Sequence, residues 1–349
     1  MKKVNLLGKT EKKLQQLMLS LGEKPFKGRQ LFKWLYGRRQ YDFMQMTDLT
    51  LELRHRLDQS FVFRNIELAE RKKSVDGTEK FLFRLDDNNL IEAVLIPDED
   101  WTTVCISSQA GCALGCRFCA TGKLGFGRDL TVGEIIGQLL FFRDQYGDDA
   151  FRNIVFMGMG EPLLNLDNVI ETIGIVSSSV GLSLSARRIT ISTSGIVPGI
   201  YRLADSGLKS NLAISLNAPT QAKRRKLMPV ANKYPLDELL ESIRYFTSTR
   251  KQRVTFEYIL FENENDSLDD ARELAKLIQG IPCKINLLAY NPVEGLSYGR
   301  PPESRIDEFA KYLYPRTPAV TVRKSRGVDI MAACGQLAGN NIRFRRGEK

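Results

Sequence analysis

The chain has 349 residues, 43% of them hydrophobic, and its 51 Lys and Arg against 41 Asp and Glu give a net charge of +10. This length can bury one large core and a small second one, and the basic excess favours a polyanionic partner. No apolar run reaches the ~20 residues of a membrane span, and the N-terminus MKKVNLLGKTEKK lacks the apolar core of a signal peptide. We therefore expect a cytoplasmic protein without a membrane partner.

Residues 1–62 predict a small helical accessory module, because apolar residues recur at helical spacing over 11–21, 29–36 and 49–61. Cations crowd the middle helix and its lead-in. A solvent-exposed helix face is the ordinary explanation for such charges. The density of positive charge on a separate small module makes RNA contact an equal alternative. The cations are Lys24, Lys27, Arg29, Lys33, Arg38 and Arg39.

Residues 63–103 predict a short antiparallel meander that links this module to the rest. Apolar and polar residues alternate on both sides of a turn at Asp76-Gly77. Glu92 lies inside the second run, between Ile91 and Ala93. A carboxylate in such a strand usually faces solvent.

From 104 to 325 the pattern alternates between strand and helix. Thr131 and Glu134 predict a capping box at the start of the first helix. About six such units predict an α/β fold: a parallel βα barrel, partial or full, with its site at the carboxyl ends of the strands. The expected strands are 104–107, 153–157, 188–192, 211–216, 253–260, 284–290 and 319–323, and the expected helices are 131–146, 166–180, 197–206, segments of 221–247, 267–279 and 304–314.

The loop after the first strand, CISSQAGCALGCRFCAT, contains a CxxxCxxC triplet: Cys112, Cys116 and Cys119, with Cys105 upstream. Three thiolates this close can hold one metal centre. A structural zinc site would usually have a fourth ligand, and the sole histidine, His55, lies far upstream. The triplet therefore favours an iron–sulfur cube with one open iron over zinc or metal-free thiols.

Small polar groups follow the other strands: GMGEP at 158–162, STSG at 192–195, SLNAP at 215–219 and Asn291-Pro292. The glycines allow close backbone approach to a ligand, and Glu161 can accept a hydrogen bond from an ammonium group. Together these loops predict a site for a zwitterionic, polyhydroxylated ligand.

These motifs are similar to those of a known family. The triplet with Phe118 resembles the radical S-adenosylmethionine (SAM) superfamily, and GMGEP resembles its GGE-type motif. From PFKGRQLFKWLY to its end, the chain resembles the RlmN/Cfr family of RNA adenine methyltransferases. The most specific segments are SSQAGCALGCRFCATG, FMGMGEPLLN, STSG, the IEAV strand with Glu92, and DIMAACGQLAGN.

The resemblance implies one [4Fe-4S] cluster on the cysteine triplet and two SAM molecules per turnover. Asn217 stands where the family often has histidine, so a proton transfer at this position is not expected. The SAM-binding residues implied are Gly160, Glu161, Ser192, Ser215, Leu216, Asn217 and Asn291.

The resemblance also implies a mechanism for adenine carbon 2, which is electron-poor and has no acidic proton. One SAM methylates Cys334, in the C-terminal segment 326–349. The other is cleaved to a 5′-deoxyadenosyl radical that takes hydrogen from the S-methyl group, and the methylene radical adds to adenine. Glu92 then acts as proton acceptor, and Cys105 closes a transient disulfide with Cys334. Cys283 matches no role.

The implied substrates are 23S rRNA, at an adenosine of the peptidyl transferase centre, and the adenosine 3′ of the anticodon in tRNA. We also expect an electron donor such as flavodoxin, and a monomer. A flipped or single-stranded adenosine is expected, because a stacked base could not reach the radical. Three basic segments are candidates for RNA contact: Lys223–Lys226; Arg323, Lys324 and Arg326; and Arg343, Arg345 and Arg346.

Two alternatives remain. One is a Cfr-like methyltransferase acting on adenine carbon 8, although LLN after GMGEP favours carbon 2. The other is a non-enzymatic RNA-binding protein with structural zinc.

Overall fold

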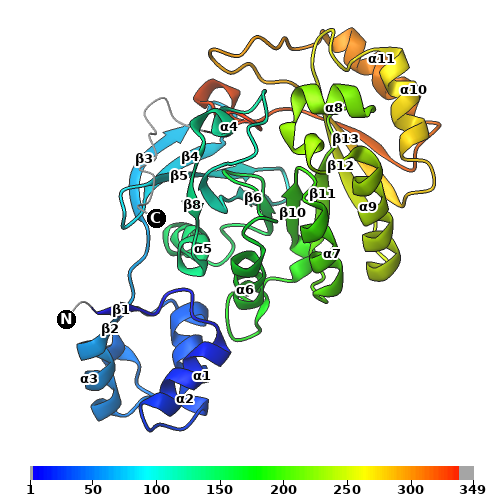
Figure 1. Cartoon of the computed structure of the whole chain (residues 1–349). Coiled ribbons are helices and arrows are strands. Elements are labelled where there is room, and N and C mark those ends of the chain that lie inside the picture. The colour runs from blue at the N-terminus through cyan, green and yellow to red at the C-terminus, as the bar shows by residue number, and fades with distance from the viewer. Residues whose placement is uncertain (1–2, 338–349) are drawn as a thin grey trace.

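The computed structural model describes residues 3–337. The N-terminal module forms a separate lobe below the large sheet in Figure 1. Its three predicted helices are confirmed, and the second continues into a π-helical turn. The elements are β1 Val4–Asn5, α1 Glu11–Ser20, α2 Phe26–Phe32, η1 Lys33–Gly37, η2 Phe43–Gln45, α3 Leu51–Ser60 and β2 Phe61–Val62. Strands β1 and β2 pair in parallel and were not predicted, because each has only two residues.

The described residues form a ten-stranded sheet in the order β14-β13-β12-β11-β10-β9-β6-β5-β4-β3. The seven strands from β14 to β6 run parallel to one another, and the last three are antiparallel. The bounds are β3 Glu67–Lys73, β4 Glu79–Arg84, β5 Leu90–Pro97, β6 Thr102–Cys105, β9 Asn153–Phe156, β10 Ile189–Thr193, β11 Asn211–Ser215, β12 Val254–Leu260, β13 Cys283–Ala289 and β14 Val320–Arg323.

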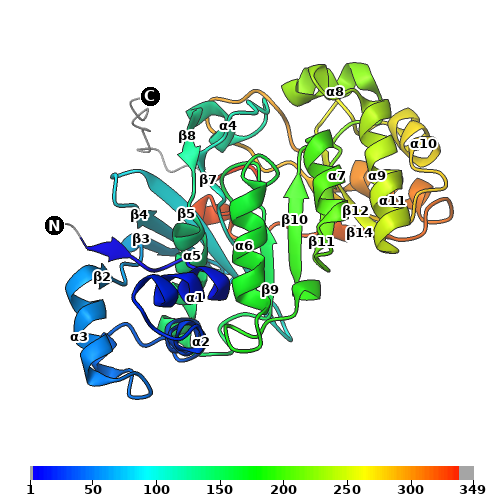
Figure 2. The same cartoon turned by 60° about the horizontal axis from the view of Figure 1, so that its bottom comes forward.

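Helices between the strands cover one face of this sheet, as Figure 2 shows for α5, α6, α7 and α9. The predicted capping box of Thr131 and Glu134 is confirmed at the start of α5. The helices are α5 Val132–Tyr146, α6 Leu166–Ser177, α7 Val197–Asp205, α8 Gln221–Leu227, α9 Leu236–Arg250, α10 Leu268–Leu277 and α11 Glu303–Leu313, with short turns η3 Ala186–Arg188, η4 Pro229–Asn232 and η5 Val328–Ile330. Within residues 3–337, no helix is both long and apolar enough to cross a membrane.

The predicted α/β architecture is confirmed, as an open sheet with β14 and β3 at its edges. The meander belongs to the same sheet, because β5 pairs with β6 at Val94 and Cys105. A small hairpin, β7 (Gln109–Gly111) with β8 (Phe126–Asp129), encloses the cysteine loop and the short helix α4 (Ala120–Leu124). The sequence did not predict this hairpin, because its strands are short and rich in glycine.

Gly8 is where the N-terminal module meets the sheet domain most tightly. Its φ is +89°, and a Cβ there would lie 2.3 Å from the backbone nitrogen of Gly133 in α5. Gly22 has a similar φ of +75° but open space around it. We expect Gly8→Ala to lower the free energy of unfolding by about 1–3 kcal/mol more than Gly22→Ala, because backbone must be displaced. Chemical denaturation of both variants measures this difference, and equal losses would contradict the tight contact.

Candidate active site

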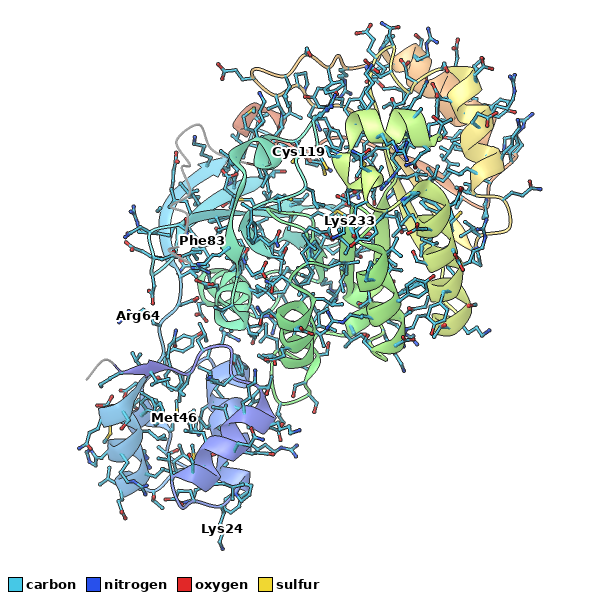
Figure 3. All side chains as sticks on the ribbon, viewed as in Figure 1. Lys24, Met46, Arg64, Phe83, Cys119 and Lys233 are labelled. Atoms are coloured by element: carbon cyan, nitrogen blue, oxygen red, sulfur yellow. The ribbon has the colours of Figure 1, made fainter. Side chains whose placement is uncertain are left out.

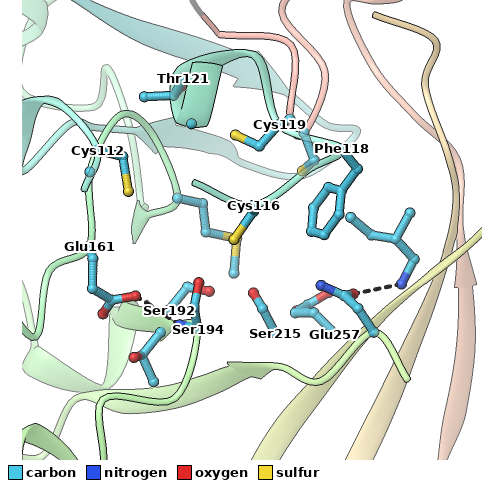
Figure 4. A pocket seen from close by; sticks show the side chains of 18 of the residues that line it. Cys112, Cys116, Phe118, Cys119, Thr121, Glu161, Ser192, Ser194, Ser215 and Glu257 are labelled. Atoms are coloured by element: carbon cyan, nitrogen blue, oxygen red, sulfur yellow. Dashed lines mark hydrogen bonds between the residues drawn. The ribbon is translucent and has the colours of Figure 1, made fainter. Parts of the chain in front are cut away.

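The carboxyl ends of the parallel strands surround one cavity, as the sequence predicted. Figure 4 shows Cys112, Cys116 and Cys119 around it, opposite Glu161 and Ser194. Other strand-end residues complete the wall: Gly160, Ser192, Thr193, Ser215, Asn217, Glu257 and Ile259. Cys334 lines it from the C-terminal segment. We call this space the cysteine cavity.

Backbone hydrogen bonds fix the cysteine loop on both sides. The N–H of Cys112 donates to the carbonyl of Gly125 at 2.8 Å, and the N–H of Arg117 donates to the carbonyl of Leu227 in α8 at 3.0 Å. The loop is therefore held between the hairpin and α8, with its thiols turned toward the cavity.

The chemistry of the three thiols fits an iron–sulfur cluster. Burial raises the pKa of Cys112 to about 12, and it also raises those of Cys116 and Cys119. The thiols are therefore protonated, and a metal must displace these protons. Between residues 3 and 337, no group of three or more His, Cys, Asp or Glu side chains is already arranged to hold a metal ion. The loop nevertheless presents three soft donors to the cavity, which suits a cluster with one open iron, while the fourth thiol there, Cys334, comes from the separate C-terminal segment.

Glu161 lies at the floor of the cavity and is 2% exposed. Its carboxylate accepts hydrogen bonds from the N–H of Leu163 at 3.1 Å and the N–H of Ser194 at 2.8 Å. Burial raises the pKa of Glu161 to about 7, although these hydrogen bonds lower it. A cation placed in the cavity would favour the ionised carboxylate.

The glycines of GMGEP have a packing role that the sequence did not reveal. Gly160 has a φ of +100°, and a Cβ there would lie 2.7 Å from the backbone nitrogen of Gln109. The loop therefore needs glycine to pack against β7, whether or not a ligand is bound.

The structure brings most of the predicted SAM-binding residues to the cysteine cavity, but not all. Leu216 is buried and lines no described cavity wall, while Asn291 lies on a neighbouring cavity. Asn217 does line the cysteine cavity, but its Oδ1 accepts a hydrogen bond from the N–H of Ile259 at 3.0 Å. Its φ of +55° also suits asparagine.

The C-terminal segment holds Cys334 at the cavity by anchors on both sides. The hydroxyl of Ser74 in the β3–β4 turn donates to the Asp329 carboxylate at 2.5 Å. The N–H of Ala120 in α4 donates to the carbonyl of Gly335 at 2.8 Å. Segments distant in sequence thus place the Cys334 side chain, which is exposed to solvent.

Cys334 also lines a second cavity, which we call the basic cavity. Its wall contains Cys105, Asn291 and the cations of the β14 edge: Arg323, Lys324 and Arg326. Cys105 and Cys334 are close enough to interact electrostatically, and burial together with Cys334 raises the pKa of Cys105. Both are free thiols. The transient disulfide between them, which the resemblance implied, stays a prediction.

Glu92 is not on a solvent face: it is 2% exposed, in β5. Its Oε1 forms a salt bridge with Lys80 Nζ at 3.1 Å, and Lys80 also donates to the carbonyl of Met331 at 3.0 Å. Glu92 lines neither the cysteine cavity nor the basic cavity. Lys80 therefore links this carboxylate to the segment that carries Cys334.

Several residues of the cysteine cavity were not among the predicted site residues, and Glu257 and Ser194 are two of them. Glu257 lies in the apolar run VTFEYIL of β12, and it accepts a hydrogen bond from Asn286 Nδ2 at 2.9 Å. Its isolated charge in a buried strand was a signal that could have been used. Ser194, next to the predicted Ser192, binds the Glu161 carboxylate through its N–H.

The three segments predicted to contact RNA differ in the exposure and pairing of their cations. In the 223–226 segment, Lys223 pairs with Asp270 and Lys226 pairs with Glu264, each at 2.6 Å, while Arg224 has no exposed surface. Of these four residues only Arg224 is buried, so the segment does not present four contiguous exposed cations, and RNA contact here stays a prediction. Arg323, Lys324 and Arg326 are exposed at the basic cavity. The third segment, Arg343, Arg345 and Arg346, lies outside the described residues.

Comparisons with known proteins agree with this geometry. Residues 4–63 match the family model of the ribosomal RNA large subunit methyltransferase N-terminal domain, and residues 106–278 match that of the radical SAM superfamily. The crystal structure of a radical SAM methyltransferase from Sphaerobacter thermophilus is 41% identical, with a TM-score of 0.89 over 95% of this chain and 98% of that one.

Two more distant structures share 16% and 12% identity and carry no functional argument. SuiB of Streptococcus suis, bound to S-adenosylmethionine, is 16% identical with a TM-score of 0.46, over 64% of this chain and 51% of that one. HydG, a maturase of the [FeFe]-hydrogenase, is 12% identical with a TM-score of 0.47, over 65% and 53%.

A partial βα barrel whose strand ends gather the CxxxCxxC loop and GMGEP at one cavity defines a radical SAM enzyme. The similarity to the Sphaerobacter thermophilus methyltransferase over nearly the whole chain assigns a narrower class of radical SAM enzyme. The chain belongs to the radical SAM methyltransferase family, in the branch with the RlmN-type N-terminal domain. This family implies an iron–sulfur cluster and SAM as cofactors.

Proposed function

We propose that this protein methylates carbon 2 of an adenosine in the peptidyl transferase centre of 23S rRNA, and the adenosine 3′ of the anticodon in tRNA. The position of Cys334 carries the proposal. This thiol lies in the wall shared by the cysteine cavity and the basic cavity. One side chain can therefore face a cofactor on one side and an RNA base on the other.

The cysteine cavity is the proposed cofactor site. Cys112, Cys116 and Cys119 would hold the cluster, which when bound supplies the electron that cleaves SAM to a 5′-deoxyadenosyl radical. Glu161 would accept hydrogen bonds from the SAM ammonium group, whose charge would favour the ionised carboxylate. The further proposed SAM contacts are Gly160, Ser192, Ser215, Leu216, Asn217 and Asn291; the side-chain oxygen of Asn291 is buried and has no hydrogen-bond partner in residues 3–337.

The basic cavity is the proposed base site. Arg323, Lys324 and Arg326 would hold the phosphates beside a flipped adenosine. Cys334 would carry the methyl group and form the bond to carbon 2. Glu92 would accept the carbon-2 proton, and Cys105 would form a disulfide with Cys334 as the thioether breaks. Glu92 lines neither cavity, and Lys80 is the contact that connects it to the segment of Cys334.

The N-terminal module is a proposed second contact for the RNA. Four of its six predicted cations, Lys24, Arg29, Lys33 and Arg38, are exposed, whereas Lys27 pairs with Glu23 and Arg39 with Asp144. Figure 3 shows Lys24 at the end of the molecule farthest from Cys119, so only an extended RNA would touch both. We place the reaction in the cytoplasm, with a monomeric enzyme and a donor such as flavodoxin.

The test uses protein reconstituted anaerobically with iron and sulfide, and RNA from cells that lack the gene. We expect methylated adenosine to form only with SAM and a low-potential reductant present. A colourless protein that binds zinc but no iron or sulfide, and leaves the RNA unmodified, would instead support the non-enzymatic alternative.

A further inference from the structure

Arg224, on α8, is the largest fully buried side chain among residues 3–337. Its Nη2 donates to the carbonyl of Ser194 at 2.6 Å. The Nε and Nη1 atoms are buried without a hydrogen-bond partner in residues 3–337. No acidic side chain in that range forms an ion pair with it. A guanidinium group is thus fully desolvated without a compensating anion.

Such burial is costly, because a charge removed from water needs a partner of opposite sign. The nearest candidate is the cysteine loop. Arg224 interacts electrostatically with Cys116, and the hydroxyl of Ser194 is hydrogen-bonded to the same thiol. The missing anion is therefore on the cavity side of the guanidinium, where Cys116 would become a thiolate on binding iron.

Gly195 and the cysteine loop both lie close to the guanidinium or its helix. Gly195 has a φ of +102°, and a Cβ there would lie 3.1 Å from Arg224 Nη2. The end of α8 is tied to the cysteine loop by the hydrogen bond from Arg117 to Leu227. The helix that carries the charge is therefore tied directly to the cysteine loop.

We propose that Arg224 is a positioning residue that serves as a fixed counter-charge to the cluster. It would compensate the Cys116 thiolate and favour the reduced cluster, which has gained one electron from a low-potential donor and is more negative. The idea rests on the proposed function, since it needs the cluster at the cysteine triplet. Because Arg224 is buried, it cannot contact RNA, and the proposed role explains its position instead.

The test compares Arg224→Gln with Arg225→Gln, because Arg225 is the adjacent, exposed arginine of the same helix. Glutamine can still donate to the Ser194 carbonyl, so the substitution removes charge while keeping a hydrogen bond. In anaerobic redox titrations followed by EPR, we expect Arg224→Gln to lower the ratio of reduced to oxidised cluster, at a fixed potential, by about tenfold. Arg225→Gln should match the wild type, and Arg224→Lys should largely restore the ratio.

A second readout separates this role from simple packing. In the apoprotein the buried charge lacks its anion, so Arg224→Met should unfold at the wild-type temperature or above it. The reconstituted variant should lose iron to a chelator faster than the wild type. A packing role would instead lower the unfolding temperature of both forms equally.

Cluster-loaded Arg224→Gln with the midpoint of the wild type would overturn the inference and leave the proposed function intact. Failure of both neutral variants to fold, while Arg225→Gln folds, would also overturn it, since Arg224 would then be structural. Wild-type protein that takes up no iron and sulfide would defeat the proposed function itself.

Discussion

Cys334→Ala is expected to lower RNA methylation by about 10⁴-fold or more, because this thiol is the proposed carrier of the methyl group. Iron and sulfide content should not change. Cys334 lies outside the CxxxCxxC loop and reaches the cysteine cavity from the C-terminal segment. Both quantities can be measured on one reconstituted sample, by nucleoside analysis and by iron and sulfide assay.

Cys283→Ala is the matched control. Cys283 is a buried thiol at the start of β13 and lines neither the cysteine cavity nor the basic cavity. This variant should methylate RNA at close to the wild-type rate. Methylation by Cys334→Ala at a rate similar to that of Cys283→Ala would show that the cysteine relay does not operate here.

Cys105→Ala is expected to trap the protein covalently on its RNA. Cys105 shares the basic cavity with Cys334, and no other cysteine lines that cavity. Without it, the thioether between Cys334 and the base should form but not break, and released product should fall by about 10³-fold or more. Denaturing gels with labelled RNA would show the slowly migrating adduct.

Glu92→Gln should trap the same adduct by a different defect, since the carbon-2 proton is no longer removed. Glutamine is preferable to alanine here, because its amide oxygen can still accept a hydrogen bond from the buried Lys80, whereas alanine would leave that ammonium group with no acceptor at this position. The double variant Cys105→Ala with Cys334→Ala should give no adduct. Free methylated product from Cys105→Ala or Glu92→Gln at the wild-type rate would rule out the corresponding role.

Periodicity and capping residues were sufficient to predict the architecture. The alternation of apolar strands with amphipathic helices gave each parallel strand to within one or two residues, and Thr131 marked the start of α5. Since parallel strands end at one edge, the loops could be assigned to one site before the structure was known. The β7–β8 hairpin was not predicted, because strands of three and four residues are too short to show a periodic pattern.

The direction in which side chains point could not be predicted in the same way. Arg224 belongs to a run of four cations, and only the packing of α8 shows that it turns inward while Arg225 stays exposed. A carboxylate in an alternating strand usually faces solvent, but Glu92 is paired with Lys80 in the interior, and the strand pattern gave no sign of this partner. Both cases depend on contacts between segments far apart in sequence, which local patterns do not encode.

The regiochemistry of the product tests the central claim most directly. RNA from cells lacking the gene, treated with the reconstituted enzyme, SAM and reductant, should be digested to nucleosides and compared with standards of both methyladenosines. The account predicts 2-methyladenosine in 23S rRNA and in tRNA. Appearance of 8-methyladenosine without 2-methyladenosine would contradict it and would assign the protein to the Cfr-like alternative.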